Sequence, residues 1–168
     1  MEDKCKNCRL DIPYPSVENV KCDNRTVRML CDAYTGAVSE LGAISEYSYQ
    51  TIILENEFPV AADILECISV TEMKHFHCLG RLILGSGIDP AIRFSGRGGR
   101  QKTGLRPITV DEGWFRNAIL TDIAAENDAV RMYEEIAHEA SSGELKAIIN
   151  RIILDERHHA ELLTDLLS

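Results

Sequence analysis

The sequence predicts an all-α protein, a four-helix bundle built from two antiparallel helix pairs that a long crossover loop joins. Apolar residues recur at helical spacing in four long segments. One connection, residues 86–110, is far longer than the others and holds five of the eleven glycines. A length of 168 residues is ordinary for one domain with a single core. We therefore expect one bundle, with its two pairs linked across its length.

The chain is expected to start with an extended lead-in over residues 1–24, which contains two prolines and no steady apolar period. Residues 25–168 form the predicted bundle. Its first helix covers residues 25–56, and Asp23 or Asn24 is the expected N-terminal cap because both side chains can accept from first-turn amides.

The remaining three helices have recognisable ends. Pro59 suits the first turn of the second helix, which the pattern continues to Leu84 before Gly85-Ser86-Gly87 ends it. The third helix is predicted over residues 111–140. Ser141-Ser142-Gly143-Glu144 is typical of a capping box and predicts the start of the fourth.

Composition narrows the classes of function. No apolar stretch approaches the roughly 18 residues of a membrane span, so we expect a protein that is not integral to a membrane. The start lacks the apolar core of a secretory signal, which predicts a cytoplasmic protein whose six cysteines are reduced. A net charge of −9 argues against nucleic acid as a partner.

Acidic residues in otherwise apolar helical patterns are the main functional signal. Each half of the chain has a lone glutamate followed by a Glu-x-x-His motif, and the intervals are 26 and 30 residues. Near-equal intervals indicate one helix pair used twice. The candidate ligands are Glu46, Glu72 and His75 in the first half, and Glu126, Glu156 and His159 in the second.

These residue types at this spacing predict a two-metal site. Residues three apart share a helix face, so the carboxylate and imidazole of one motif can address one ion together. Four carboxylates balance two divalent ions, whereas four buried acids without metal would repel one another. A shifted pair, Asp155 and His158, competes on the fourth helix, but Glu156 and His159 fit the apolar stripe better.

This ligand order resembles that of the ferritin-like di-iron and di-manganese carboxylate proteins, and most closely the rubrerythrin-like and bacterioferritin-like branch. The resemblance covers roughly residues 25–167. It implies a ferritin-like bundle in which Glu72 and Glu156 bridge two metals. It further implies that Glu46 with His75, and Glu126 with His159, are terminal ligands. Tyr133 corresponds to a tyrosine that steadies a carboxylate, although an ordinary buried tyrosine is equally expected.

Several features depart from those relatives. Only Cys5-x-x-Cys8 matches the paired cysteines of the rubredoxin-like site that rubrerythrins usually carry, with Cys22 and Cys31 at irregular intervals, so single thiols are favoured over a metal knuckle. Met73 occupies the place of a bacterioferritin haem ligand, but a packing role is favoured and haem is not expected. The shorter first interval, 26 residues, puts cage assembly in doubt.

The other polar residues are expected to have ordinary roles. His77 and His138 are predicted to lie at the surface or in packing contacts, and Cys67 and Cys78 to be small core or interface residues. The basic stretch of residues 91–110 is predicted to be a solvated crossover, with binding of phosphate or an acidic partner as the alternative.

The resemblance implies an oxidoreductase with two iron ions per chain, manganese being possible, that reacts with hydrogen peroxide or dioxygen. The alternatives are a noncatalytic iron-binding or storage subunit, a manganese-catalase-like enzyme and a metal-free structural bundle. The electron donor is unknown. Apolar residues on long helices predict a homodimer or higher homo-oligomer.

Overall fold

The computed structural model describes residues 8–92 and 108–168, and the described residues contain five α-helices and no strand. The predicted all-α class is therefore confirmed. The helices are α1 (Asn24–Thr35), α2 (Glu40–Leu54), α3 (Pro59–Gly85), α4 (Glu112–Glu139) and α5 (Gly143–Asp165).

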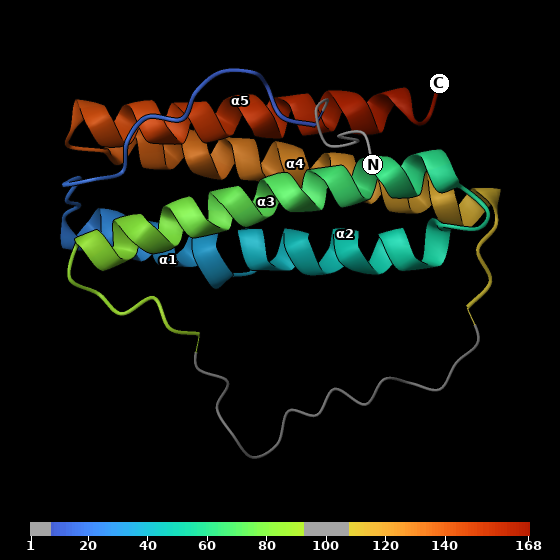
Figure 1. Ribbon diagram of the computed structural model, residues 1–168, viewed down its shortest axis with the longest axis horizontal. Helices are drawn as coiled ribbons and strands as arrows, with labels where there is room; N and C mark the ends of the chain where they lie inside the picture. The colour runs from blue at the N-terminus through green and yellow to red at the C-terminus, as the bar shows by residue number, and fades with distance from the viewer. Residues whose placement is uncertain (1–7, 93–107) are drawn as a thin grey trace, which may run out of the picture.

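The helices form a bundle in which α1 and α2 follow each other along one edge and together occupy one helix position (Figure 1). α3 returns antiparallel to them, and α4 then begins at the end where α3 began, so α3 and α4 run in the same direction. α5 closes the second antiparallel pair. This is the predicted ferritin-like topology. Most of the basic stretch of residues 91–110 lies outside the described residues.

Helix ends follow the local sequence. The Asp23 side chain accepts from the amides of Arg25 and Thr26 and caps α1. Pro59 lies in the first turn of α3. Ser142 caps α5, where its side chain accepts from the amide of Leu145. The starts of α1 and α3 therefore have the expected chemistry, and α5 has a serine cap, with Leu145 rather than Glu144 at the third helical position.

The predicted helix of residues 25–56 is interrupted between Thr35 and Glu40. At Gly36 an added Cβ would lie 2.5 Å from the Asp32 carbonyl oxygen, so a residue with a side chain does not fit without a backbone shift. Ser39 then caps α2 by accepting from the amide of Gly42. The interruption starts a new helix with a new phase, and Glu40 is its first residue.

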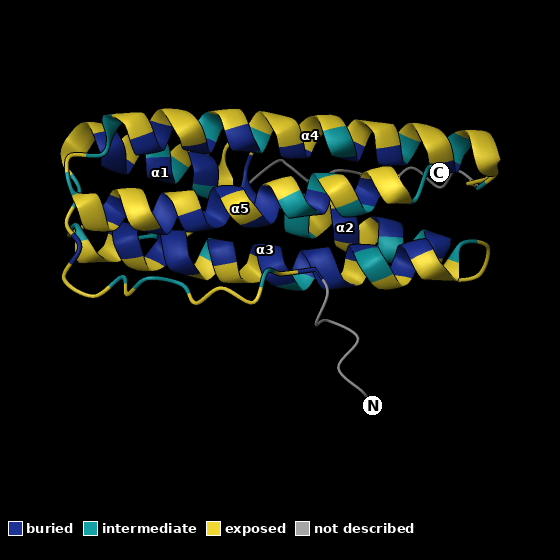
Figure 2. Ribbon diagram, turned by 90° about the horizontal axis from the view of Figure 1, so that it is seen from above, coloured by how far each residue is buried: buried dark blue, intermediate teal, exposed yellow. Residues whose placement is uncertain are grey.

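Two apolar cores fill the bundle, one toward each end, and buried faces point inward on every helix (Figure 2). One core includes Leu30, Leu79 and Ile148, and the other includes Leu65 and Leu163. Along α3 and α5 the buried residues between the two cores are polar, and they include Glu72, His75, Glu156 and His159. This middle layer holds the candidate site.

The segment from Cys8 to Asp23 contains no helix and contacts both α3 and α5. Cys8 and Cys67 form a disulfide, so the expectation that all cysteines are reduced thiols is wrong for this pair. Cys22, Cys31 and Cys78 are free thiols. Cys5 lies outside the described residues. No described helix is both long enough and apolar enough to cross a membrane.

Candidate metal centre

Six buried side chains converge in the middle layer of the bundle. They form two groups that share Glu72 and Glu156, and in each group the ligand atoms lie within 4.8 Å of one another. Glu40 and His75 complete one group, and Glu126 and His159 complete the other. None of the six is more than 4% exposed.

The two imidazoles point their Nδ1 atoms at the shared acids. His75 Nδ1 lies 2.9 Å from Glu72 Oε2, 3.0 Å from Glu156 Oε1 and 3.6 Å from Glu40 Oε2. His159 Nδ1 lies 2.8 Å from Glu72 Oε1 and 3.4 Å from Glu156 Oε2. Each shared glutamate thus presents one oxygen to each histidine, the arrangement that a bridging carboxylate requires.

The opposite ring nitrogens face acceptors that lie outside the carboxylate groups. His159 Nε2 lies 3.0 Å from the carbonyl oxygen of Cys8, and His75 Nε2 lies 2.9 Å from the Tyr14 hydroxyl and 3.3 Å from Asp155 Oδ2. A backbone carbonyl can only accept, so it holds the His159 proton on Nε2. Oriented in this way, a neutral imidazole offers the Nδ1 lone pair to a metal.

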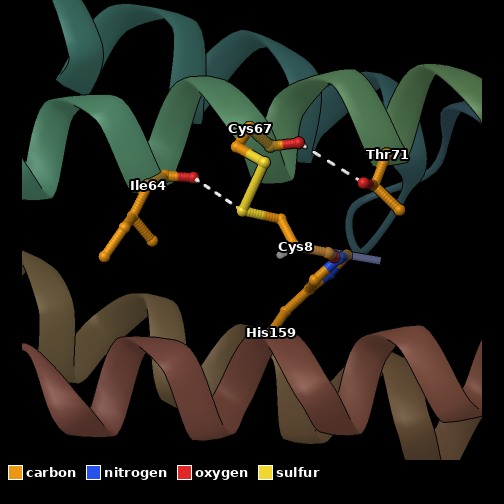
Figure 3. Close-up of a disulfide and its surroundings, with 5 residues drawn as sticks. All are labelled: Cys8, Ile64, Cys67, Thr71 and His159. Atoms are coloured by element: carbon orange, nitrogen blue, oxygen red, sulfur yellow. Dashed lines mark hydrogen bonds between the residues drawn. A yellow bond between two sulfur atoms is a disulfide. The ribbon is translucent and has the colours of Figure 1, made fainter. Parts of the chain in front are cut away.

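The N-terminal segment is held where it can make these contacts. The disulfide ties Cys8 to α3, while His159 reaches Cys8 from α5 (Figure 3). Arg151 donates to the carbonyl oxygens of Leu10 and Ile12, and the Leu10 amide donates to Asp155. The segment therefore supports the outer side of both imidazoles.

Two tyrosines cross between the halves of the bundle. The hydroxyl of Tyr133 on α4 donates to Glu40, and that of Tyr47 on α2 donates to Glu126. Each tyrosine follows the glutamate of its own half by seven residues, Tyr47 after Glu40 and Tyr133 after Glu126. The site therefore has approximate twofold symmetry that includes the residues behind the ligands.

The structure brings together five of the six sequence-predicted ligands, but it replaces Glu46 with Glu40. Glu46 is exposed on α2 and belongs to neither group. The prediction assumed one continuous helix, whereas the interruption at Gly36 changes which residues face inward. A signal was present, since Glu40 precedes Glu72 by 32 residues and Glu126 precedes Glu156 by 30.

The remaining candidates lie outside the two groups. Met73 is 47% exposed on α3. Asp155, from the competing register, is fully buried behind His75, and His158 lies at the protein periphery 3.8 Å from Glu161. Sequence reasoning missed Tyr14, because no spacing marks the contact of an irregular segment with a remote helix. It also missed Tyr47, whose signal was its place seven residues after Glu40, the same spacing that Tyr133 has after Glu126. His77 and His138 are exposed.

Burial and mutual charge control protonation of the site. Burial raises the pKa of Glu40 and Glu126 well above the ordinary range, and the neighbouring carboxylates add to this effect. Burial also opposes ionisation of Glu72, but the adjacent charges of His159 and His75 lower its pKa well below normal. Without metal, Glu40 and Glu126 therefore tend to stay protonated, whereas Glu72 tends to stay ionised beside the two imidazoles.

The donor set fits two metal ions. Glu40 Oε2, Glu72 Oε1, Glu156 Oε1 and His159 Nδ1 are buried and make no hydrogen bond of suitable geometry, although each carboxylate oxygen lies within 3.6 Å of an imidazole Nδ1. Such atoms are costly to bury unless something compensates them. Four carboxylates and two imidazoles suit iron, manganese or zinc, and two shared carboxylates can hold two ions close together.

A cavity of about 260 Å³ reaches these ligands. Its inner wall includes Glu40, Glu72, Glu126 and Glu156, and small residues such as Ala43 line it elsewhere. A volume of this size admits water, dioxygen or peroxide but is small for a drug-sized ligand.

Comparisons with known proteins agree with the ferritin-like fold. Residues 117–168 match the family model for rubrerythrin. A manganese catalase of Anabaena, KatB, has a similar structure, with a TM-score of 0.73 and 21% identity over 95% of this chain and 78% of the catalase. The bacterioferritin of Rhodobacter capsulatus, solved with a metal-free dinuclear site and a haem iron, gives a TM-score of 0.64 and 26% identity, covering 87% of this chain and 85% of that one. No curated protein matches the chain.

The fold and the site together define a class, the ferritin-like proteins with a carboxylate and histidine cluster at the centre of the bundle. The chain resembles the superfamily of ferritin-like di-metal carboxylate proteins, as the order of its acids and histidines predicted. Within that superfamily it is similar to rubrerythrin, manganese catalase and bacterioferritin.

Proposed function

We propose that the protein is a di-metal oxidoreductase that reacts with hydrogen peroxide or dioxygen. The observation that carries this proposal is the sharing of Glu72 and Glu156 between two groups of ligands, each with its own inward-pointing imidazole. Two metal ions held by such ligands supply two electrons to a small oxidant, which is chemistry that no side chain in the site could supply.

The residues have distinct proposed roles. Glu40 and His75 would hold one ion, Glu126 and His159 the other, and Glu72 and Glu156 both. We favour iron, as the resemblance of the ligand order implies. Manganese is the alternative, because carboxylate and imidazole donors suit both metals. The similarity to a manganese catalase keeps manganese open.

The chain's own groups prepare the site for a small oxidant. Tyr47 and Tyr133 hold the terminal carboxylates by donating hydrogen bonds to them. Asp155 and the Cys8 carbonyl orient the imidazoles. The cavity brings substrate to the face lined by Glu40 and Glu126, while the apolar cores exclude bulk water from the rest of the site.

Metal analysis combined with peroxide turnover tests the proposal. The purified protein is expected to hold two iron or manganese ions per chain and to consume peroxide, and His75→Ala should lose metal and turnover together. His138→Ala, which changes an exposed histidine on α4, is the matched control. Bound metal without any peroxide or dioxygen reaction would instead support the second candidate, a noncatalytic iron-binding or storage subunit.

Partners beyond the oxidant are also proposals. Exposed apolar residues such as Ile52, Val60 and Leu84, each more than 60% exposed, are the basis for proposing a homodimer or higher homo-oligomer. Light scattering of the purified protein tests it. A cytoplasmic location and an external electron donor stay predictions.

A further inference from the structure

A second polar group lies along the cavity, away from the six central ligands. Glu46 and Asp122 both line the cavity wall, as do the central acids Glu72 and Glu126. Glu46 is exposed and Glu72 is buried, so the cavity has an outer and an inner end. Asp122 precedes Glu126 by four residues on α4, which is about one helical turn.

The side chain of Gln50 holds the outer pair together. Its Nε2 donates to Glu46 Oε1 and to Asp122 Oδ1, at 3.0 Å in both cases. The two carboxylate oxygens are therefore no more than about 6 Å apart. Two oxygens bound directly to one small divalent cation lie within roughly 4.5 Å of each other, so a cation here would bind at least one carboxylate directly and reach the other directly or through a bound water.

Two side chains of the outer group, those of Asp122 and Gln50, are buried and incompletely satisfied. Asp122 is 4% exposed and Gln50 is 2% exposed. Asp122 Oδ2 and Gln50 Oε1 have no hydrogen-bond partner. In the described parts of the chain, no lysine, arginine or histidine forms an ion pair with Asp122. An uncompensated buried carboxylate beside a cavity needs a proton or a cation.

We propose that Glu46 and Asp122 form an auxiliary site for a divalent cation at the outer end of the cavity, which supplies Mn²⁺ or Fe²⁺ to the central ligands. Carboxylate oxygens and water suit these hard ions. Gln50 positions the two acids. The supply role rests on the proposed function, whereas the existence of the outer site does not.

The site has the features of a transit position. Two carboxylates offer fewer protein ligands than the central groups, so the outer cation binds more weakly and is released more easily. From Asp122 the next carboxylate along α4 is Glu126, which belongs to the central ligands. Negative charge along the cavity also raises the local concentration of cations and speeds their arrival.

Titration of the metal-free full chain with Mn²⁺ tests the proposal, with free Mn²⁺ followed by electron paramagnetic resonance. Wild type is expected to bind two ions tightly and a third more weakly. Asp122→Asn and Glu46→Gln should each lose the third ion and keep the two tight ones. They should also load the central pair at least about tenfold more slowly. Glu66→Gln, which changes an exposed glutamate of α3 outside the cavity, should bind three.

Two further variants separate this inference from the proposed function. Glu156→Ala removes a shared central ligand and should abolish tight binding while leaving the weak ion. Adding Asp122→Asn to it should then remove that ion. Circular dichroism confirms that each variant is folded. Binding of only two ions by wild type, with unchanged loading in Asp122→Asn, would overturn the auxiliary site and leave the central site intact. If wild type itself bound no ion tightly but bound one weak ion that Asp122→Asn removes, the proposed function would be overturned and this inference would stand.

Discussion

At the scale of single residues, the buried acids determine what the centre can hold. Glu40 is 4% exposed and has one oxygen without a partner, while its other oxygen accepts from Tyr133. A glutamate in this position has a strong tendency to stay protonated unless a cation compensates its charge. Its carboxylate is therefore expected to contribute directly to metal affinity.

Metal binding by a Glu40 variant, compared with that of a variant of the exposed Glu46, tests this role. Glu40→Ala should weaken binding of one central ion by more than the roughly 10- to 100-fold typical for loss of an outer-shell partner. Glu46→Ala should retain both central ions, because Glu46 belongs to neither group. Native mass spectrometry at limiting metal measures both. Retention of two ions by Glu40→Ala and their loss in Glu46→Ala would reverse the assignment.

Asp122 predicts a pH-dependent stability. Burial raises the pKa of Asp122 from 3.8 to about 7, the hydrogen bond from Gln50 opposes the rise, and Glu46 adds to it. Because the folded-state pKa is raised, the stability contribution is fully present below about pH 4 and is lost as pH rises through about 7. Deprotonation at neutral pH then costs up to about 4 kcal/mol.

The metal-free Asp122→Asn variant should avoid that loss. Its melting temperature should match wild type near pH 4, exceed it increasingly up to about pH 7 and by a constant amount above that, as thermal denaturation across this range would show. The introduced asparagine side chain keeps an oxygen that can accept from Gln50, so the comparison isolates the charge. A difference that is constant with pH would contradict the assigned cause.

At the scale of elements, the N-terminal segment is bound to the bundle by a covalent link and by polar contacts. The Cys8–Cys67 disulfide closes a loop with a sequence separation of 59, and Arg151 and Asp155 hold the residues that follow Cys8. The segment consequently contributes to the stability of the bundle as well as to the orientation of His159.

Cys67→Ser should reduce the free energy of unfolding by about 4 kcal/mol, the chain-entropy value for a loop of this length. Reducing agent should lower wild-type stability toward that of the variant. Cys31→Ser, which changes a free thiol, is the control and should have little effect. Urea denaturation under oxidising and reducing conditions measures these differences. Equal midpoints for Cys67→Ser and Cys31→Ser would show that the link does not stabilise the fold.

Much at the element scale could be predicted from the sequence, and the rest has a physical reason. Helical periodicity and caps such as Asp23 and Ser142 are local, so they located the helix starts well. The interruption at Gly36 depends on one close backbone approach, yet it changes the phase of all later residues in α2. Helical spacing alone therefore selected Glu46 where the fold uses Glu40.

Contacts of the N-terminal segment could not be predicted in the same way. His159 and Cys8 are 151 residues apart, and the partner of Cys8 is Cys67 rather than a nearby cysteine. Such pairs are set by the docking of an irregular segment, which leaves no period in the sequence. The two Glu-x-x-His motifs succeeded because both ligands of each motif lie on one helix.

At the scale of the whole molecule, two apolar cores enclose a layer of charge. The four carboxylates come from four different helices, so their mutual repulsion acts to push the helices apart. Metal ions would convert this repulsion into attraction that joins both halves of the bundle. Stability of the whole fold is therefore coupled to metal binding.

Metal loading should accordingly raise the melting temperature, and a chelator should reverse the rise. Each ion is expected to add about 4 kcal/mol when free metal is roughly 1,000 times its dissociation constant. Binding should also release protons and weaken as pH falls, because the pKa values of His75 and His159 are raised by the surrounding acids although burial opposes this. Calorimetry in the presence of metal measures both effects. An unchanged melting temperature would contradict the coupling.

The most direct measurement is anomalous diffraction from crystals grown with Mn²⁺ or Fe²⁺. Two adjacent peaks are expected in the middle layer, both in contact with Glu72 and Glu156, one with Glu40 and His75 and the other with Glu126 and His159. A single peak there, or none while metal binds elsewhere, would contradict the assignment of a two-metal centre.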